Sequence, residues 1–125
     1  MRFLKRFWIR IDYKVREISW MIQRARRGWS DRDAWGIDGY LCEILPPMLE
    51  RLKDSHVIPM EEMTEEDWNQ KLDIMRIGFI AAKRMLDLDY PTLSGAELRN
   101  AINDDSDTFK VGMDVFAEHF FSLWD

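Results

Sequence analysis

Few residues of this sequence combine the chemical type and the spacing that catalysis requires. The two histidines, His56 and His119, are 63 positions apart, and no His-Glu-x-x-His or Glu-x-x-His motif contains either one. Cys42 is the single cysteine, so the chain cannot form an internal disulfide or a cysteine-rich zinc site. The glycines do not cluster into a loop that could hold a phosphate. We therefore predict no catalytic residue, metal or cofactor, and expect Cys42 and His119 to be structural.

A short acidic run is the nearest approach to a metal motif. Asn103, Asp105 and Asp107 have the spacing of the first ligands of an EF-hand loop. However, Thr108 stands where that loop needs a glycine, and Asp114 stands where it needs a bidentate glutamate. Helix capping and solvation explain the run better, so no calcium site is predicted.

Arginine, tryptophan and aspartate are concentrated between residues 24 and 35. Gly28 is placed to end a helix, and Ser30 is placed to cap the next one, so the simplest interpretation is a helix stop and a helix start. Guanidinium groups near a helix N-terminus can also bind a phosphate, and exposed Arg and Trp side chains favour protein contacts. The candidate ligand- or partner-binding residues are Arg24, Arg26, Arg27, Trp29, Asp31, Arg32 and Trp35.

Residues 3–27 form a basic amphipathic segment. Residues 1–27 carry nine Lys or Arg against two acidic residues, whereas residues 28–125 carry nine against 21, so the net charges are +7 and −12. We expect the basic segment to pack on the acidic remainder; a membrane surface and an anionic ligand are alternatives, and the acidic remainder disfavours duplex nucleic acid. Its apolar residues recur at spacings of 4-3-4-3-4, which predicts a helix. These residues are Leu4, Trp8, Ile11, Val15, Ile18 and Ile22.

The rest of the chain predicts further helices and no strand. A second helix begins at Ser30 and is expected to kink or break at Pro46-Pro47, because proline lacks an amide donor. Thr64 and Ser94 each begin a helix with an acidic residue three positions later, as in a capping box. The expected helices span 3–27, 30–54, 64–88, 94–103 and 105–123, with a connector at 55–63.

The predicted fold class is all-α, with residues 1–125 forming a single-domain bundle of four to five helices. The apolar spacing near 3.5 in three segments favours helices packed at shallow angles. The domain comprises the basic helix 3–27 and an acidic helical body, 30–125. No segment has the roughly 20 apolar residues that cross a bilayer, and charged residues interrupt the N-terminus, so a cytoplasmic protein is expected.

Several motifs occur in an order that resembles a group of small, uncharacterised bacteriophage-encoded helical proteins. The stretch 27–38 is similar to their RGxSDxDxWxxD pattern, and an Ile-Leu-Pro at 44–46 lies in the helix that follows it. A start similar to their TEEEW helix follows at 64–68, and the chain ends in Leu-Trp-Asp at 123–125. The resemblance covers most of residues 24–125 and implies a phage origin. It brings no activity, cofactor or site residue with it.

We expect a non-enzymatic binding protein that acts through protein–protein contacts. The surplus of aromatic and methionine side chains suits such contacts. The partner would be a host factor, such as a defence protein that it inhibits, or a second copy of the chain. The alternative is a small-molecule binder that sequesters a phosphate-bearing nucleotide at the arginine-rich junction.

Overall fold

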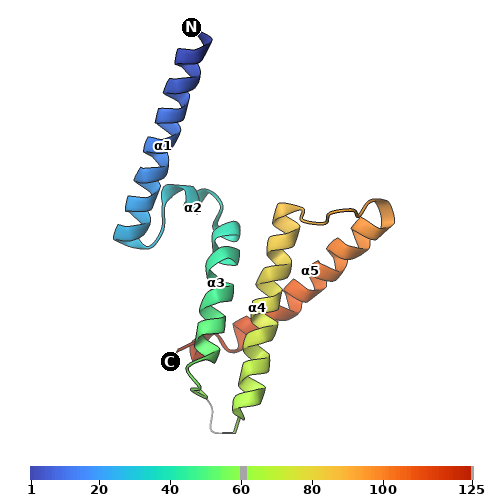
Figure 1. The fold of residues 1–125 in the computed structure, drawn as a ribbon. Helices are drawn as coiled ribbons and strands as arrows, with labels where there is room; N and C mark the ends of the chain where they lie inside the picture. Colours follow the sequence, from blue (N-terminus) through green and yellow to red (C-terminus); the bar gives the residue numbers. More distant parts are fainter. Residues whose placement is uncertain (60–61, 125) are drawn as a thin grey trace. The chain divides into compact units, whose positions relative to one another are not determined.

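The computed structural model describes residues 1–59 and 62–124 and confirms the all-α class. No strand occurs among these residues (Figure 1). Part of the predicted connector, residues 60–61, and the last residue of the Leu-Trp-Asp motif lie outside the described residues. The described helices are α1 (Arg2–Arg27), α2 (Asp31–Trp35), α3 (Ile37–Lys53), α4 (Glu65–Asp87) and α5 (Gly95–Glu118), followed by the 3-10 helix η1 (Phe120–Ser122).

The chain divides into two compact units, Met1–Ile37 and Asp38–Asp125, which we call unit 1 and unit 2. The two units also carry net charges of opposite sign. Unit 1 carries ten basic and four acidic residues, a net charge of +6, whereas unit 2 carries eight basic and 19 acidic residues, a net charge of −11. The segment 30–37, predicted to belong to the acidic body, groups with the basic helix.

Two of the predicted helix starts have capping boxes, one where a box was predicted, at Thr64, and one at Ser30, where only an N-cap was predicted. Ser30 precedes α2 and Thr64 precedes α4, and each side chain accepts a hydrogen bond from the backbone N–H three residues later. The carboxylates of Asp33 and Asp67 complete the boxes by accepting from the two cap backbones. The box predicted at Ser94 is absent, because no side-chain hydrogen bond caps α5 there.

Two predicted helix boundaries were wrong. The second helix is interrupted at Gly36, and α3 then runs without a break through Pro46-Pro47. The two prolines remove two amide donors from α3, so a kink there stays a prediction. The helices predicted at 94–103 and 105–123 are one helix, α5, which ends at Glu118. Asp105 therefore lies inside a helix rather than at a cap.

The core of unit 2 is centred on α4. Trp68, Leu72, Met75 and Phe79, spaced four, three and four residues apart, are at most 4% exposed. They pack against Cys42 and Leu49 of α3 and against partly buried side chains of α5, including Phe116, whose ring lies edge-on to that of Phe79 at 5.5 Å. This is the amphipathic helix that the sequence predicted.

Helices α4 and α5 cross at a pair of glycines (Figure 1). A Cβ on Gly112 would lie 2.8 Å from the Cα of Gly78 and 3.0 Å from the carbonyl oxygen of Ile74. The first distance is shorter than real Cβ contacts and the second is unusually tight, so the two backbones approach as closely as they do because neither residue has a side chain.

Candidate functional site: helix α1 and the junction that follows it

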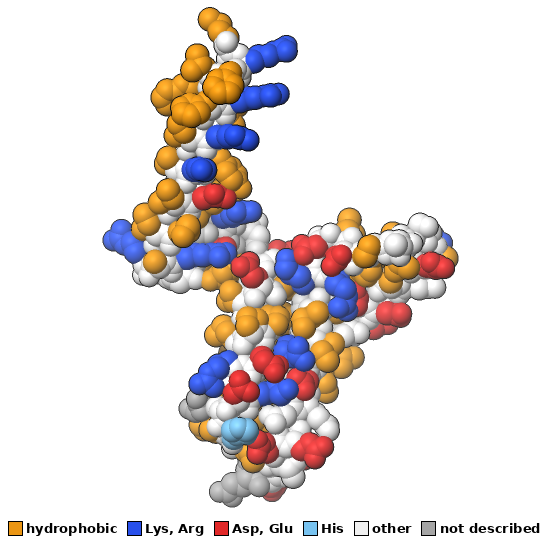
Figure 2. Space-filling model, viewed as in Figure 1, with side chains coloured by type: hydrophobic (Ala, Val, Ile, Leu, Met, Phe, Trp, Pro, Cys, Tyr) orange, Lys and Arg blue, Asp and Glu red, His pale blue; other side chains and the backbone are white. Residues whose placement is uncertain are grey.

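Helix α1 has an apolar face that its own unit leaves uncovered. No residue of the helix is buried, although it is 26 residues long. Figure 2 shows apolar side chains along one side of the helix and Lys and Arg side chains along the other. We call the first side the apolar face; every member is at least 38% exposed. Its residues are Phe3, Leu4, Phe7, Trp8, Ile11, Val15, Ile18 and Ile22.

The cationic side of α1 has few internal ion-pair partners. Asp12 pairs with Arg16 at 3.2 Å, one turn away on the same helix. Within unit 1, no ion pair neutralises the five cations of the first half of the helix. They are Arg2, Lys5, Arg6, Arg10 and Lys14.

The chain reverses direction after α1 through a tight turn. Gly28 has a φ of 84°, in the left-handed region that glycine favours, and its N–H donates to the carbonyl oxygen of Arg24 at 2.9 Å. Ser30 then caps α2 and is 1% exposed. The predicted helix stop and helix start are both confirmed.

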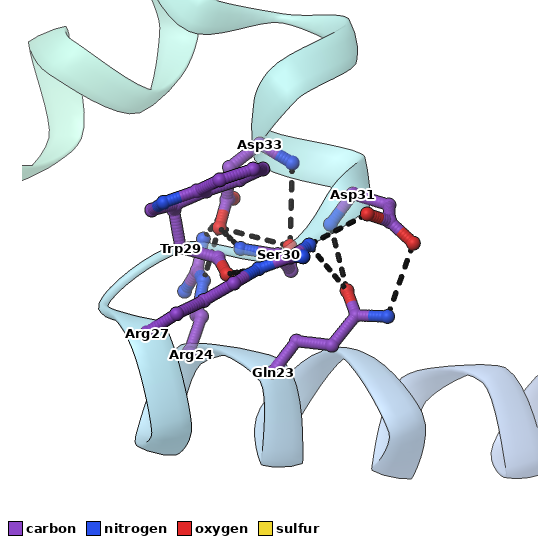
Figure 3. Close-up of polar contacts among 7 residues, drawn as sticks. All are labelled: Gln23, Arg24, Arg27, Trp29, Ser30, Asp31 and Asp33. Carbon is purple, nitrogen blue, oxygen red and sulfur yellow. Dashed lines mark hydrogen bonds and ion pairs between the residues drawn. The ribbon is translucent and has the colours of Figure 1, made fainter.

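Arg24 and Asp33 join the two sides of this turn (Figure 3). The guanidinium donates from Nε to Oδ2 at 2.8 Å and from Nη2 to Oδ1 at 2.5 Å, a bidentate geometry. Asp33 is 6% exposed and also accepts from the N–H and hydroxyl of Ser30. The hydrogen bonds from Arg24 and then Ser30 hold the pKa of the Asp33 carboxyl well below its usual range, against the opposing effect of burial.

A second cluster at the turn is built around Arg27 and Asp31 (Figure 3). Arg27 donates to the Asp31 carboxylate at 2.6 Å and to the carbonyl oxygen of Trp29 at 2.9 Å, and its guanidinium lies 3.8 Å from the centre of the Trp29 ring. Gln23 donates to Asp31 at 3.0 Å and accepts from its backbone N–H at 2.7 Å. Hydrogen bonds from Arg27 and Gln23 lower the pKa of Asp31.

The remaining candidates take less part in this junction. Trp35 lies edge-on to Trp20, with ring centres 6.2 Å apart, and the guanidinium of Arg32 is 5.3 Å from the Trp20 ring centre. Trp35 is nevertheless 75% exposed. Among the described residues, Arg26 is exposed and has no ion-pair partner.

The junction therefore brings together four of the seven predicted residues: Arg24, Arg27, Trp29 and Asp31. Sequence reasoning missed the role of Gln23 and the pairing of Arg24 with Asp33, nine positions apart. The available indication was the Gly28 turn, because a chain reversal sets the last turn of one helix beside the first turn of the next. Two of the arginines are paired with carboxylates, and these ion pairs hold the turn between α1 and α2.

Two of the other reactive side chains, Cys42 and His119, are buried. Cys42 is 7% exposed, and burial raises the pKa of its thiol, with the nearby Asp38 charge adding to the effect. His119 is 5% exposed and lies edge-on to Trp68 with ring centres 5.7 Å apart. Exposed His56 contacts Glu65 through Nδ1, and this hydrogen bond raises the pKa of the imidazole. In the described part of the chain, no group of His, Cys, Asp and Glu could hold a metal ion.

A second Arg–Asp pair lies in unit 2. Arg84 donates to both carboxylate oxygens of Asp105, at 3.0 and 2.7 Å, and the Tyr90 hydroxyl donates to the same carboxylate at 2.6 Å. The acidic run predicted to cap or solvate a helix thus contains a buried carboxylate that ties α5 to the end of α4. Burial and the hydrogen bond with Asp105 raise the pKa of Tyr90 to about 12.

Comparison with known proteins adds no information about the role of this junction. No family model matches the chain, and no curated protein and no solved structure is significantly similar to it. The resemblance to small phage proteins therefore stays a prediction. Among the described residues, no helix combines the length and apolar character needed to cross a membrane.

Proposed function

We propose that this protein is a non-enzymatic binding protein and that the apolar face of α1 is its binding surface. The observation that carries the proposal is the absence of any buried residue along this helix. A continuous exposed apolar stripe of this length is typical of an interaction surface, because isolated apolar residues are common on protein surfaces but long contiguous patches are not.

The two units have different parts in this proposal. Unit 2 has its own buried core around Leu72 and Met75. Unit 1 presents the binding helix, and the Arg24–Asp33 pair fixes the turn at its end. The protein would act in the cytoplasm, and a host factor or a second copy stays among the partners that the phage resemblance suggests.

The alternative function, a phosphate pocket at the junction, has less support. There, the guanidinium groups of Arg24 and Arg27 already donate to the carboxylates of Asp33 and Asp31. These two carboxylates would repel an incoming phosphate.

Thiol labelling tests whether the apolar face is available. Ile11 lies in that face, whereas Ile9 lies on the cationic side, because two residues rotate a helix by about 200°. Purified Ile11→Cys and Ile9→Cys variants are treated with a bulky maleimide at low protein concentration. We expect the two new thiols to react at rates within about threefold of each other, since both are exposed. Cys42 provides a slow internal reference because it is buried and its pKa is raised.

The same experiment can contradict the proposal. If Ile11→Cys reacts far more slowly than Ile9→Cys at every dilution, the chain itself covers the apolar face, and the proposal fails. If the slow reaction appears only at high protein concentration, a second copy covers the face, which supports a binding role through self-association.

A further inference from the structure

We infer that the surface recognised by α1 is an anionic membrane surface, on which the helix lies flat. This inference rests on the proposed function and names its ligand class. In the bound state the apolar face would enter the boundary between headgroups and acyl chains, and the Lys and Arg side chains would reach the lipid phosphates. Three features of α1 support a lipid surface over a protein groove or a second copy.

The first feature is the mixture of side chains at the start of the helix. Phe3, Arg6, Phe7 and Arg10 line a shallow recess in which two aromatic rings lie beside two guanidinium groups. A phospholipid offers the complementary combination, an anionic phosphate for the guanidinium groups above an acyl chain for the rings. Arg and Lys beside Phe, Trp and Leu are the composition of helices that bind at a membrane interface.

The second feature is length. Helices that bind in protein grooves use a few anchors within about two turns, at i, i+3, i+4 and i+7. The apolar face of α1 instead continues from Phe3 to Ile22, about five and a half turns. A flat, extended surface can cover all of it at once.

The third feature is charge, which disfavours a second copy of α1 as the occupant. In a two-helix coiled coil along Leu4–Ile22, the flanking positions would be Lys5, Asp12, Ser19 and Arg26 on one side and Phe7, Lys14 and Met21 on the other. Only Asp12 is acidic among them, and it already pairs with Arg16. Two helices of net charge +7 would repel, whereas anionic lipid attracts them.

Unit 2 makes the inference specific to α1. With a net charge of −11, unit 2 is repelled by an anionic surface, so attraction must come from unit 1. Binding should therefore weaken steeply with added salt, because exposed charges are screened beyond about 8 Å at 0.15 M.

Vesicle co-sedimentation of the full chain tests the inference. Vesicles in which phosphatidylcholine is mixed with anionic phosphatidylglycerol are compared with vesicles of phosphatidylcholine alone. We expect Ile11→Ser to lower the partition coefficient roughly tenfold, since an apolar side chain is lost from the bound face. Ile9→Ser is the matched control and should change it less than about twofold, because Ile9 lies on the other side of the helix.

A charge variant completes the test. Arg6→Gln, Arg10→Gln and Lys14→Gln together should lower partition on the order of 100-fold, at about fivefold for each cation removed. Equal binding to both vesicle types, or equal loss for Ile9→Ser and Ile11→Ser, would overturn the inference. If the Ile11→Cys thiol reacts with maleimide but the wild-type protein binds neither kind of vesicle, the assignment of a lipid ligand fails while the proposed binding function stands. Failure of the proposed function itself would instead appear as a protected Ile11→Cys thiol in the dilute, lipid-free protein.

Discussion

Helices α1 and α4 have the same apolar spacing and opposite surroundings. In α1, Leu4 is 59% exposed and nothing in the helix is buried, whereas in α4 Leu72 is fully buried. Both helices repeat 4-3-4-3-4, so periodicity specifies that a helix has an apolar face and leaves open what covers that face. In unit 2 the cover is the rest of the unit; in unit 1 we propose that it comes from outside.

The two units also share a device at their turns. Arg24 and Asp33 close the turn between α1 and α2, and Arg84 and Asp105 close the connection between α4 and α5. The two aspartates differ in the residue that donates the additional hydrogen bond. Asp33 accepts a hydrogen bond from the hydroxyl of the cap residue Ser30, whereas Asp105 accepts one from the hydroxyl of Tyr90. Each unit thus fixes its helix connection with a paired charge, whether or not a core lies beneath.

The largest contrast should come from truncating a leucine in each helix. Leu72→Ala removes a fully buried side chain and should lower the free energy of unfolding by about 2–5 kcal/mol. Leu4→Ala, its counterpart on the apolar face, should change it by less than about 0.5 kcal/mol. Urea unfolding followed by circular dichroism measures both. Equal destabilisation would show that α1 is packed in the folded chain.

The crossing of α4 and α5 should respond almost as strongly. Gly112→Ala places a Cβ 2.8 Å from the Cα of Gly78 and should cost about 1–3 kcal/mol, because both backbones must move apart. Gly39→Ala, in α3 with nothing within 4 Å of the new Cβ, should be neutral or gain up to about 1 kcal/mol. Thermal unfolding of the two variants separates these outcomes. Two equally stable variants would contradict the close crossing.

Acid should weaken the Arg84–Asp105 connection. Because the hydrogen bond with Arg84 lowers the pKa of Asp105, ionised Asp105 stabilises the fold above the unfolded-state value of about 4, and this contribution disappears as pH falls through the folded value. Asp105→Asn should therefore cost about 1–2 kcal/mol at pH 7 and less at pH 3.

Urea unfolding at both pH values measures this difference. Asp107→Asn is the control, because Asp107 is exposed two positions along the same helix and should have little effect at either pH. A cost for Asp105→Asn that is as large at pH 3 as at pH 7 would contradict the assigned role of the charge.

The smallest effect belongs to the junction in unit 1. Arg24→Lys keeps the charge and loses the bidentate geometry, so it should destabilise the turn by about 1 kcal/mol. Faster hydrogen exchange at the backbone N–H groups of Asp33 and Ala34 would report the change. Arg10→Lys, on the exposed cationic side of α1, should leave these amides unaffected, and an equal effect from both variants would refute a specific role for Arg24.

The sequence predicted the elements better than their connections. Local chemistry sets the caps at Ser30 and Thr64 and the stop at Gly28, so these were predictable. The sequence left open whether Pro46-Pro47 kinks or breaks the helix, and α3 is continuous there; the interruption at Gly36 was not predicted. The single helix α5 was missed because Asp105 was assigned from its acidic neighbours, whereas its partner Arg84 lies 21 positions away.

The candidate site was predicted in composition but not in arrangement. The junction does bring together Arg24, Arg27, Trp29 and Asp31. Their polar groups bind other residues of the junction, which a list of residue types cannot reveal. The exposure of the α1 apolar face was also beyond the sequence, since the same pattern in α4 is a core. The spacing of apolar residues within one helix does not say which other part of the structure, if any, packs against them.

Hydrogen exchange on the full chain tests the central claim most directly. In dilute, lipid-free protein, we predict that amides of α1 around Ile11 and Ile18 exchange through local opening, much faster than α4 amides around Leu72, which require global unfolding. Anionic vesicles should then slow α1 and leave α4 unchanged. If α1 is as protected as α4 before any vesicle is added, the chain covers its own apolar face, and the account is contradicted.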